Sequence, residues 1–139
     1  MFDTVLIAGL GLMGGSMAKT IKARTLSRVL GWNRTRATAE QALADGSIDA
    51  IATEALYKEA DLVIIGLYPQ ATVDWLLENM PKMKKGCVIV DMVGVKQFMV
   101  DHLEQAALDA GVHYVGGHPM AGREFSGLDY SLPTLFDGA

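Results

Sequence analysis

A glycine-rich turn near the amino terminus constrains the fold of this chain more than any other feature. The segment Gly9-Leu10-Gly11-Leu12-Met13-Gly14 has the spacing G-x-G-x-x-G, follows the apolar run 5–8, and opens a stretch of near-helical periodicity. In that context the first glycine allows a tight turn, the second lets the backbone approach a pyrophosphate, and the third lets helix and strand pack closely. We therefore predict dinucleotide binding by Gly9, Gly11, Leu12, Met13 and Gly14, the alternative being an ordinary glycine turn.

The rest of the chain alternates between candidate strands and helices. Strands are expected at 27–32, 48–52, 62–67, 86–90 and 112–115, and helices at 35–44, 72–79 and 95–110. Thr35 is expected to provide a hydroxyl cap, Pro69 to end a strand, and Gly111 to end the last helix. Val73, Leu76 and Leu77 are expected on the inner side of their helix. The alternation predicts an α/β fold of the Rossmann type, a doubly wound, mainly parallel sheet with helices on both faces.

Composition limits the classes of partner. The 139 residues are half apolar and one fifth charged, which fits one globular domain over residues 1–139. A net charge of −4 with scattered basic residues argues against nucleic-acid binding. No uninterrupted apolar stretch reaches the roughly 18 residues of a membrane span, and the N-terminus lacks the basic region of a secretion signal. We expect a cytoplasmic protein with its single cysteine, Cys87, buried in a strand.

The segment Trp32-Asn33-Arg34-Thr35 stands about 20 residues after the glycine turn, where NAD-binding domains place a carboxylate for the ribose. No carboxylate is present. Asn33 can bond the ribose, Thr35 can donate to an anion and Arg34 can pair with a 2′-phosphate, so NADP is favoured and NAD stays possible. The alternative for Arg34 is a solvated surface residue. We also expect cofactor contacts from Leu67, Tyr68 and Pro69, at the end of a buried strand.

Two motifs resemble the prephenate dehydrogenase family, which includes arogenate-using relatives. These are GLGLMGGSMA at residues 9–18 and GGHPMAGREFSG at residues 116–127, the second being the more specific. The resemblance covers essentially the whole chain and implies an NAD(P)-dependent oxidoreductase of tyrosine biosynthesis. Members of this family follow the nucleotide-binding domain with a helical domain that forms a homodimer. We interpret this chain as the first part only, truncated or incomplete, with 116–139 as active-site loop and tail.

The resemblance gives His118 the catalytic role. It implies the oxidative decarboxylation of prephenate or arogenate, in which hydride passes to the nicotinamide, CO2 leaves and the ring becomes aromatic. A neutral imidazole can accept the proton of the ring hydroxyl, since its ordinary pKa is about 6.5. The alternative is a histidine that caps a turn. Arg123 is a candidate for a substrate carboxylate or a surface ion pair, and Glu124 and Ser126 for organising the loop.

The segment at residues 91–96 departs from the family. Many members have glycine-serine-valine-lysine there, with a serine hydroxyl that assists the histidine, whereas this chain has Gly94 in that position. Lys96 stays available as a substrate or loop contact, the alternative being a solvent-facing lysine.

Two other functions compete with this interpretation. One is a different NADP-dependent dehydrogenase of the hydroxyacid or imine type, which has no need of the H-P-M-A-G motif. The other is a nucleotide-binding module without turnover, and we expect this chain by itself to bind cofactor with little or no activity. No metal is expected, because the three histidines and Cys87 lack ligand spacing, and His102 and His113 are expected to be solvated or packing residues.

Overall fold

Within the residues that the structure describes, the sheet has six strands and all of its pairings are parallel. The computed structural model describes residues 2–92 and 97–116. The strand order is β3-β2-β1-β4-β5-β6, the doubly wound arrangement that the alternation of elements predicts. The strands are β1 (Thr4–Ala8), β2 (Arg28–Trp32), β3 (Ala50–Ile51), β4 (Leu62–Ile65), β5 (Val88–Asp91) and β6 (His113–Gly116).

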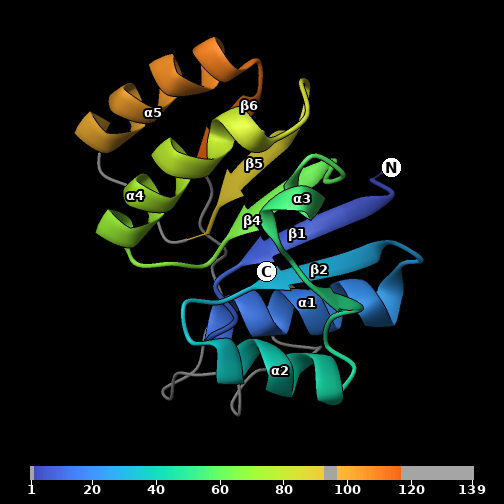
Figure 1. The fold of residues 1–139 in the computed structure, drawn as a ribbon. Coiled ribbons are helices and arrows are strands. Elements are labelled where there is room, and N and C mark those ends of the chain that lie inside the picture. The colour runs from blue at the N-terminus through green and yellow to red at the C-terminus, as the bar shows by residue number, and fades with distance from the viewer. Residues whose placement is uncertain (1, 93–96, 117–139) are drawn as a thin grey trace.

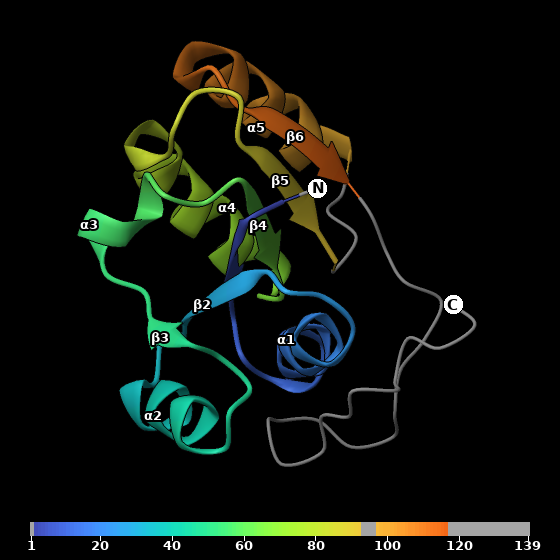
Figure 2. The same ribbon diagram turned by 90° about the vertical axis from the view of Figure 1, so that its right-hand side faces the viewer.

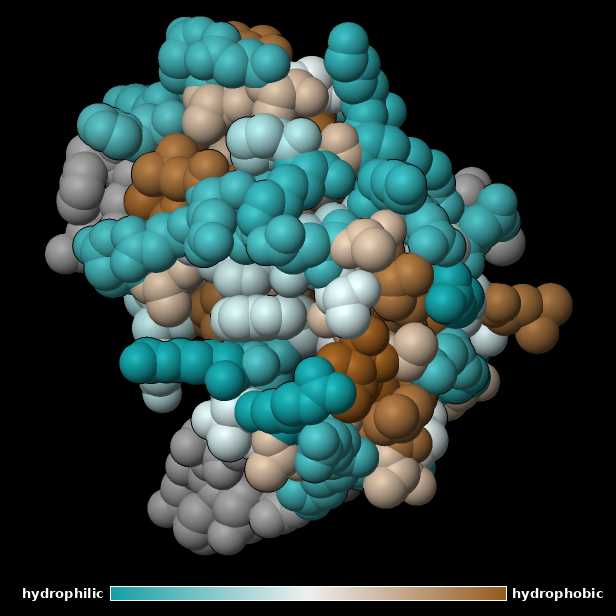
Figure 3. Space-filling view, viewed as in Figure 1, coloured by the Kyte–Doolittle hydropathy of each residue, from teal (hydrophilic) through white to brown (hydrophobic). Residues whose placement is uncertain are grey.

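Helices cover both faces of the sheet (Figures 1 and 2). Helices α1 (Leu12–Arg24) and α2 (Arg36–Ala44) lie on one face, and α4 (Pro69–Asn79) and α5 (Gln97–Ala110) lie on the other. The short helix α3 (Glu54–Tyr57) follows β3, and a 3-10 turn, Met80–Lys82, follows α4. On the face shown in Figure 3, hydrophilic side chains cover most of the surface and hydrophobic ones appear in limited groups between them.

Two hydrophobic clusters form the core, one on each face of the sheet. Alternation along β1 sends Val5 and Ile7 into the cluster with α1 and α2, and Leu6 and Ala8 into the cluster with α4 and α5. Because both faces are covered, the central strands β1 and β4 are apolar after Thr4, as the runs in the sequence predict. Cys87 is buried in the second cluster, as expected.

Three local expectations are wrong, and one helix was not expected. Pro69 does not merely end a strand, because it is the first residue of α4, where its fixed φ and missing N–H are tolerated. Leu77 is 45% exposed, since α4 turns Val73 and Leu76 toward the sheet instead. Thr35 stands at the N-cap of α2 but makes no side-chain cap bond. Helix α3 was not expected, because four residues are too short to show a helical period.

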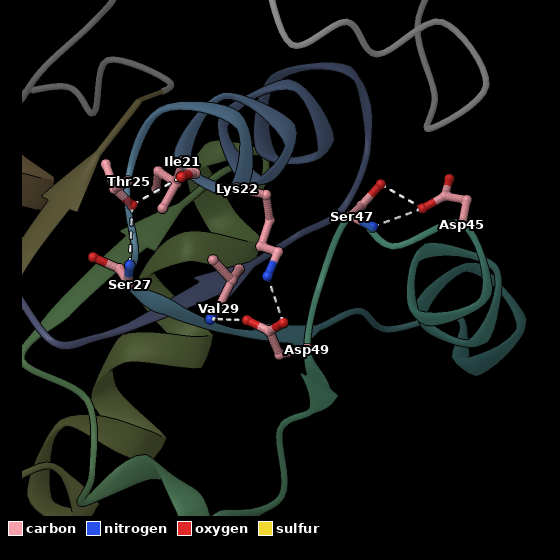
Figure 4. A network of polar contacts seen from close by, with 8 residues as sticks. All are labelled: Ile21, Lys22, Thr25, Ser27, Val29, Asp45, Ser47 and Asp49. Atoms are coloured by element: carbon pink, nitrogen blue, oxygen red, sulfur yellow. Dashed lines mark hydrogen bonds and ion pairs between the residues drawn. The ribbon is translucent and has the colours of Figure 1, made fainter.

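Two aspartates tie neighbouring strands together at the amino edge of the sheet. The carboxylate of Asp49 accepts a hydrogen bond from the backbone N–H of Val29 at 2.8 Å and forms an ion pair with Lys22 at 2.6 Å (Figure 4). The carboxylate of Asp61 accepts the backbone N–H of Thr4 at 3.0 Å. Each aspartate also donates its own N–H to the carbonyl of the same strand residue, at 2.8 and 2.9 Å. At the amino edge, the carboxylates of these two aspartates are therefore bonded to neighbouring strands.

Candidate dinucleotide-binding site

The predicted cofactor residues meet at the carboxyl edge of the sheet. Strands β1 and β4 are neighbours at the centre, and the chain winds from β1 toward β3 and from β4 toward β6. The connections after them diverge, which creates the crevice in which such folds bind ligands. Ala8 pairs with Trp32 on one side and with Ile65 on the other. The segments 9–14, 33–35 and 67–69 therefore follow three adjacent strands at one edge.

Close packing requires the first and third glycines of the turn. Gly9 has φ of +95°, and a Cβ built there would lie 2.7 Å from the carbonyl oxygen of Gly66. A Cβ on Gly14 would overlap the carbonyl oxygen of Gly9. Gly66, which the sequence analysis did not single out, also lies against this turn, because a Cβ built on Gly66 would lie 3.1 Å from the nitrogen of Gly14. The turn is thus packed directly against the end of β4.

Gly11 has a different environment from the other two glycines. A Cβ built on Gly11 would meet nothing within 4 Å, so packing of the described chain does not require glycine there. Gly11 is the N-cap of α1, it makes no side-chain cap bond, and the first turn contains no acidic residue. The amino end of α1 therefore offers backbone N–H groups and a positive dipole end beside open space, which is the arrangement that binds phosphates. Leu12 and Met13 begin this helix.

Asn33 joins the two loops on the adenosine side of the predicted site. Its Oδ1 accepts the N–H of Leu10 at 2.9 Å, and its Nδ2 donates to the carbonyl of Thr35 at 3.1 Å. Arg34 and Thr35 are both exposed. The structure therefore brings all three residues of this segment to the predicted edge, and it shows the amide of Asn33 in contact with protein backbone.

Leu67, Tyr68 and Pro69 form the connection from β4 to α4. The carbonyl of Leu67 accepts the hydroxyl of Thr72 at 3.0 Å, and the carbonyl of Tyr68 accepts the N–H of Thr72 at 2.8 Å. Tyr68 is the N-cap of α4 and is 81% exposed. An aromatic side chain with this exposure at the carboxyl edge offers a surface for a planar ligand group.

Comparisons with known proteins agree with this geometry. The family model described as "Prephenate dehydrogenase, nucleotide-binding domain" matches residues 17–139. The chain belongs to the prephenate dehydrogenase family. A prephenate dehydrogenase of Bacillus subtilis is 38% identical over 143 aligned positions, which cover 100% of this chain and 38% of that protein. The chain therefore spans well under half the length of this relative.

Solved structures of the prephenate dehydrogenase family share the fold. The structure of prephenate dehydrogenase from Aquifex aeolicus superposes with a TM-score of 0.85 and 30% identity, covering 96% of this chain and 49% of that one. A complex of the A. aeolicus enzyme with hydroxyphenyl propionate and NAD+ gives a TM-score of 0.81 and 31% identity, covering 99% of this chain and 49% of that one. Both matches support the Rossmann-type description of this prephenate dehydrogenase family domain.

The sequence analysis missed Asp91, at the carboxyl end of β5 in this family member. Asp91 is fully buried, and its Oδ2 accepts the hydroxyl of Tyr114 at 3.3 Å. Burial, together with the nearby carboxylate, raises the pKa of Tyr114. The available signal was an acidic residue directly after the apolar run Val88-Ile89-Val90. A buried carboxylate at the ligand-binding edge of a parallel sheet is a functional-site candidate.

Several predicted site residues of this family member lie outside the described residues. They are Gly94, Lys96, His118, Arg123, Glu124 and Ser126. Within the described ranges, His102 and His113 are exposed, in agreement with the expectation of solvated histidines.

Burial raises the pKa of Cys87 to about 11 and keeps the thiol protonated. The described part of the chain contains no group of three or more His, Cys, Asp or Glu residues suited to a metal ion. It also contains no helix long and apolar enough to cross a membrane.

Proposed function

We propose that this chain is the cofactor-binding part of an NADP- or NAD-dependent dehydrogenase of tyrosine biosynthesis that acts on prephenate or arogenate. The observation that carries the proposal is the family match over residues 17–139. This match disfavours the hydroxyacid or imine type of dehydrogenase. The relatives are longer than this chain, so the activity proposed is that of the longer protein. We further propose that this longer protein is a cytoplasmic homodimer.

The residues at the carboxyl edge fit a nicotinamide dinucleotide. Gly11 would leave room for the pyrophosphate, and the amino end of α1 would donate N–H groups to it. Leu67, Tyr68 and Pro69 would line the site from the end of β4. When bound, the nicotinamide supplies the acceptor for the hydride. The switch point between β1 and β4 would place the dinucleotide at the carboxyl edge of the sheet.

NADP is the cofactor that the local chemistry favours. Arg34 is exposed and directly follows Asn33, and it makes no ion pair with any residue that the structure describes. A guanidinium can pair with the 2′-phosphate that distinguishes NADP from NAD, and the hydroxyl of Thr35 can donate to the same group. No carboxylate stands at position 33 to repel that phosphate.

We assign to His118 the role of accepting the proton of the substrate hydroxyl. A neutral imidazole accepts this proton as carbonyl character develops at the ring carbon, which raises the rate of hydride loss. Arg123 would pair with a substrate carboxylate, and Glu124, Ser126, Gly94 and Lys96 would contact substrate or organise its loop. These assignments rest on the motifs of the family in this sequence, with residues 116–139 forming the active-site loop and tail of a single domain, 1–139.

Calorimetric titration of the chain with NADP and with NAD tests the proposal. We expect binding of both and tighter binding of NADP, by about tenfold, because a hydrogen bond between charged groups is worth about 1.5 kcal/mol. Arg34→Ala should remove the preference and leave the affinity for NAD unchanged. Glu40→Ala, on the exposed face of α2, is the matched control. Binding of neither cofactor would refute the dehydrogenase proposal.

Turnover is a separate part of the proposal. We propose that the chain by itself forms little or no NADPH with prephenate, because family members supply part of the active site from residues beyond those matched here. Production of NADPH at a rate typical of an enzyme, about 1 s⁻¹ or more, would contradict this part and leave the cofactor assignment intact.

A further inference from the structure

The side chain of Asn33, in the loop after β2, reaches the loop that follows β1. Leu10 belongs to the glycine turn after β1, and Thr35 is the N-cap of α2 after β2. Asn33 bonds to both, through Oδ1 to the N–H of Leu10 at 2.9 Å and through Nδ2 to the carbonyl of Thr35 at 3.1 Å. One amide therefore connects the turn expected to hold the pyrophosphate with the segment expected to select the 2′ group.

The two partners fix the orientation of this amide. Leu10 offers a backbone N–H, which requires an acceptor, and Thr35 offers a carbonyl, which requires a donor. Rotating the amide by 180° would set two donors against each other and two acceptors against each other. Among side chains of this length, aspartate lacks the donor and leucine lacks both groups. An amide at position 33 can therefore make both bonds, whereas aspartate can make only the bond to Leu10.

The connection extends an existing ladder. Ala8 pairs with Trp32 at the end of the parallel β1–β2 ladder, and the next backbone bond runs from the N–H of Gly9 to the carbonyl of Trp32 at 2.8 Å. Asn33 then adds a side-chain bond to Leu10, whose own side chain is fully buried. Three successive residues before Gly11 are thus bonded to the β2 side: Ala8 through strand pairing, Gly9 through its backbone N–H, and Leu10 through the side chain of Asn33.

We propose that Asn33 is a positioning residue that holds the pyrophosphate-binding turn, and that its amide does not act as a direct ligand of the ribose. The inference rests on the proposed function. It implies that the carboxylate of NAD-specific sites cannot be introduced here without loss. Asn33→Asp keeps an acceptor for Leu10, but loses the donor to Thr35 and places a charge against a carbonyl oxygen.

Nucleotide probes that differ in one hydroxyl separate the two roles. ADP and 2′-deoxy-ADP carry the same phosphates, and only ADP has the ribose 2′-hydroxyl. If Asn33 positions the turn, Asn33→Ala weakens both ligands by the same factor, about tenfold for one lost hydrogen bond of typical strength. If Asn33 binds the ribose, the loss for ADP exceeds the loss for 2′-deoxy-ADP. Circular dichroism confirms folding, and Gln105→Ala, an exposed amide on α5 bonded to Asp109, is the control.

Amide hydrogen exchange of the ligand-free chain tests the connection itself. We expect the N–H of Leu10 to exchange at least about tenfold faster in Asn33→Ala and to stay protected in Asn33→Asp, which retains the acceptor. We also expect Asn33→Asp to weaken NAD and NADP alike. Unchanged exchange at Leu10, a loss confined to ADP, or a gain in NAD affinity in Asn33→Asp would each overturn the inference.

Failure of the inference and failure of the proposed function give different results. If the unmodified chain binds neither ADP nor NADP, the proposed function falls and the positioning role falls with it, even where Leu10 exchange responds to the substitution. If the unmodified chain binds both probes and the affinity losses are unequal, the proposed function stands and only the positioning role is overturned.

Discussion

Gly11 and Gly14 belong to the same turn but should respond differently to the same substitution. Gly14→Ala places a Cβ against the backbone carbonyl of Gly9 and close to the side chain of Ile7, which leaves it no room. We expect a loss of at least about 3 kcal/mol in the free energy of unfolding. Gly11→Ala places its Cβ in open space, so we expect a loss of about 1 kcal/mol, the cost of alanine at an N-cap.

Urea unfolding followed by circular dichroism measures both variants, and titration with NADP measures their binding. Gly11→Ala should fold and lose most of its affinity, since the methyl group occupies the space left for the pyrophosphate. Gly46→Ala is unsuitable as a control because Gly46 has φ of +81°. Equal stability losses in the two variants, or unchanged cofactor affinity in Gly11→Ala, would contradict this account of the turn.

Single residues were predicted well where type and spacing determine the role. The glycine spacing placed Gly9 and Gly14 correctly, because a tight turn between strand and helix requires them whatever surrounds it. The sequence offered the ribose as a partner for the amide of Asn33, and it did not predict the bond to Leu10, which is distant in sequence and visible only in the fold. Asp91 was missed for a related reason, because its hydrogen bond from Tyr114 on the neighbouring strand is visible only in the fold.

Elements at the amino edge of the sheet should control the stability of the domain in acid. Asp61 directly precedes β4. Its carboxylate forms an ion pair with Lys84 and accepts hydrogen bonds from the backbone N–H groups of Asp3 and Thr4, where β1 begins. The bond from Lys84 is the main cause that lowers the pKa of Asp61 below its ordinary value, and burial opposes it. A carboxyl whose pKa is lowered in the folded state stabilises that state above the unfolded pKa, about 3.9.

Asp61→Ala should therefore lower the free energy of unfolding at pH 7 by about 1 to 2 kcal/mol, through loss of the bonds to β1. The difference from the unmodified chain should shrink as the pH falls from about 4 through the lowered folded pKa, because the native carboxyl then becomes protonated. Urea unfolding at pH 7, 4 and 3 measures this trend. Glu40→Ala, which breaks an exposed pair with Arg36, should change stability by less than about 0.5 kcal/mol at every pH. A constant difference for Asp61→Ala would contradict the assigned charge role.

Whole elements were predicted where the hydrophobic period is clear. The apolar run at β4 and the periodic stretch at α5 gave the correct types, because burial on two faces or on one stripe determines each pattern. The start of α4 was wrong, since Pro69 suits both a strand end and the first turn of a helix. Its burial pattern was wrong at Leu77 because the direction in which a helix faces depends on the elements packed against it.

At the scale of the whole molecule, the two edges of the sheet have different properties. Aspartates at 49 and 61 close the amino edge with hydrogen bonds between strands and helices. The carboxyl edge has an uncapped helix start at Gly11 and exposed residues at Arg34 and Tyr68. The alternation of elements predicted the parallel sheet, but it did not predict the contacts of Asp49 and Asp61 at the amino edge, because these depend on strand order and on loops that meet in space.

An open edge of this kind should make the stability of the domain depend on cofactor. A ligand that binds only the folded chain adds RT ln(1 + [L]/Kd) to the free energy of unfolding, about 2.7 kcal/mol at 100 times Kd. For a domain of this size we expect NADP at that concentration to raise Tm by about 10 °C. Differential scanning calorimetry with increasing NADP measures the shift, and Gly11→Ala should reduce it to about 1 °C or less. A shift of equal size in Gly11→Ala would mean that the nucleotide binds elsewhere than at the amino end of α1.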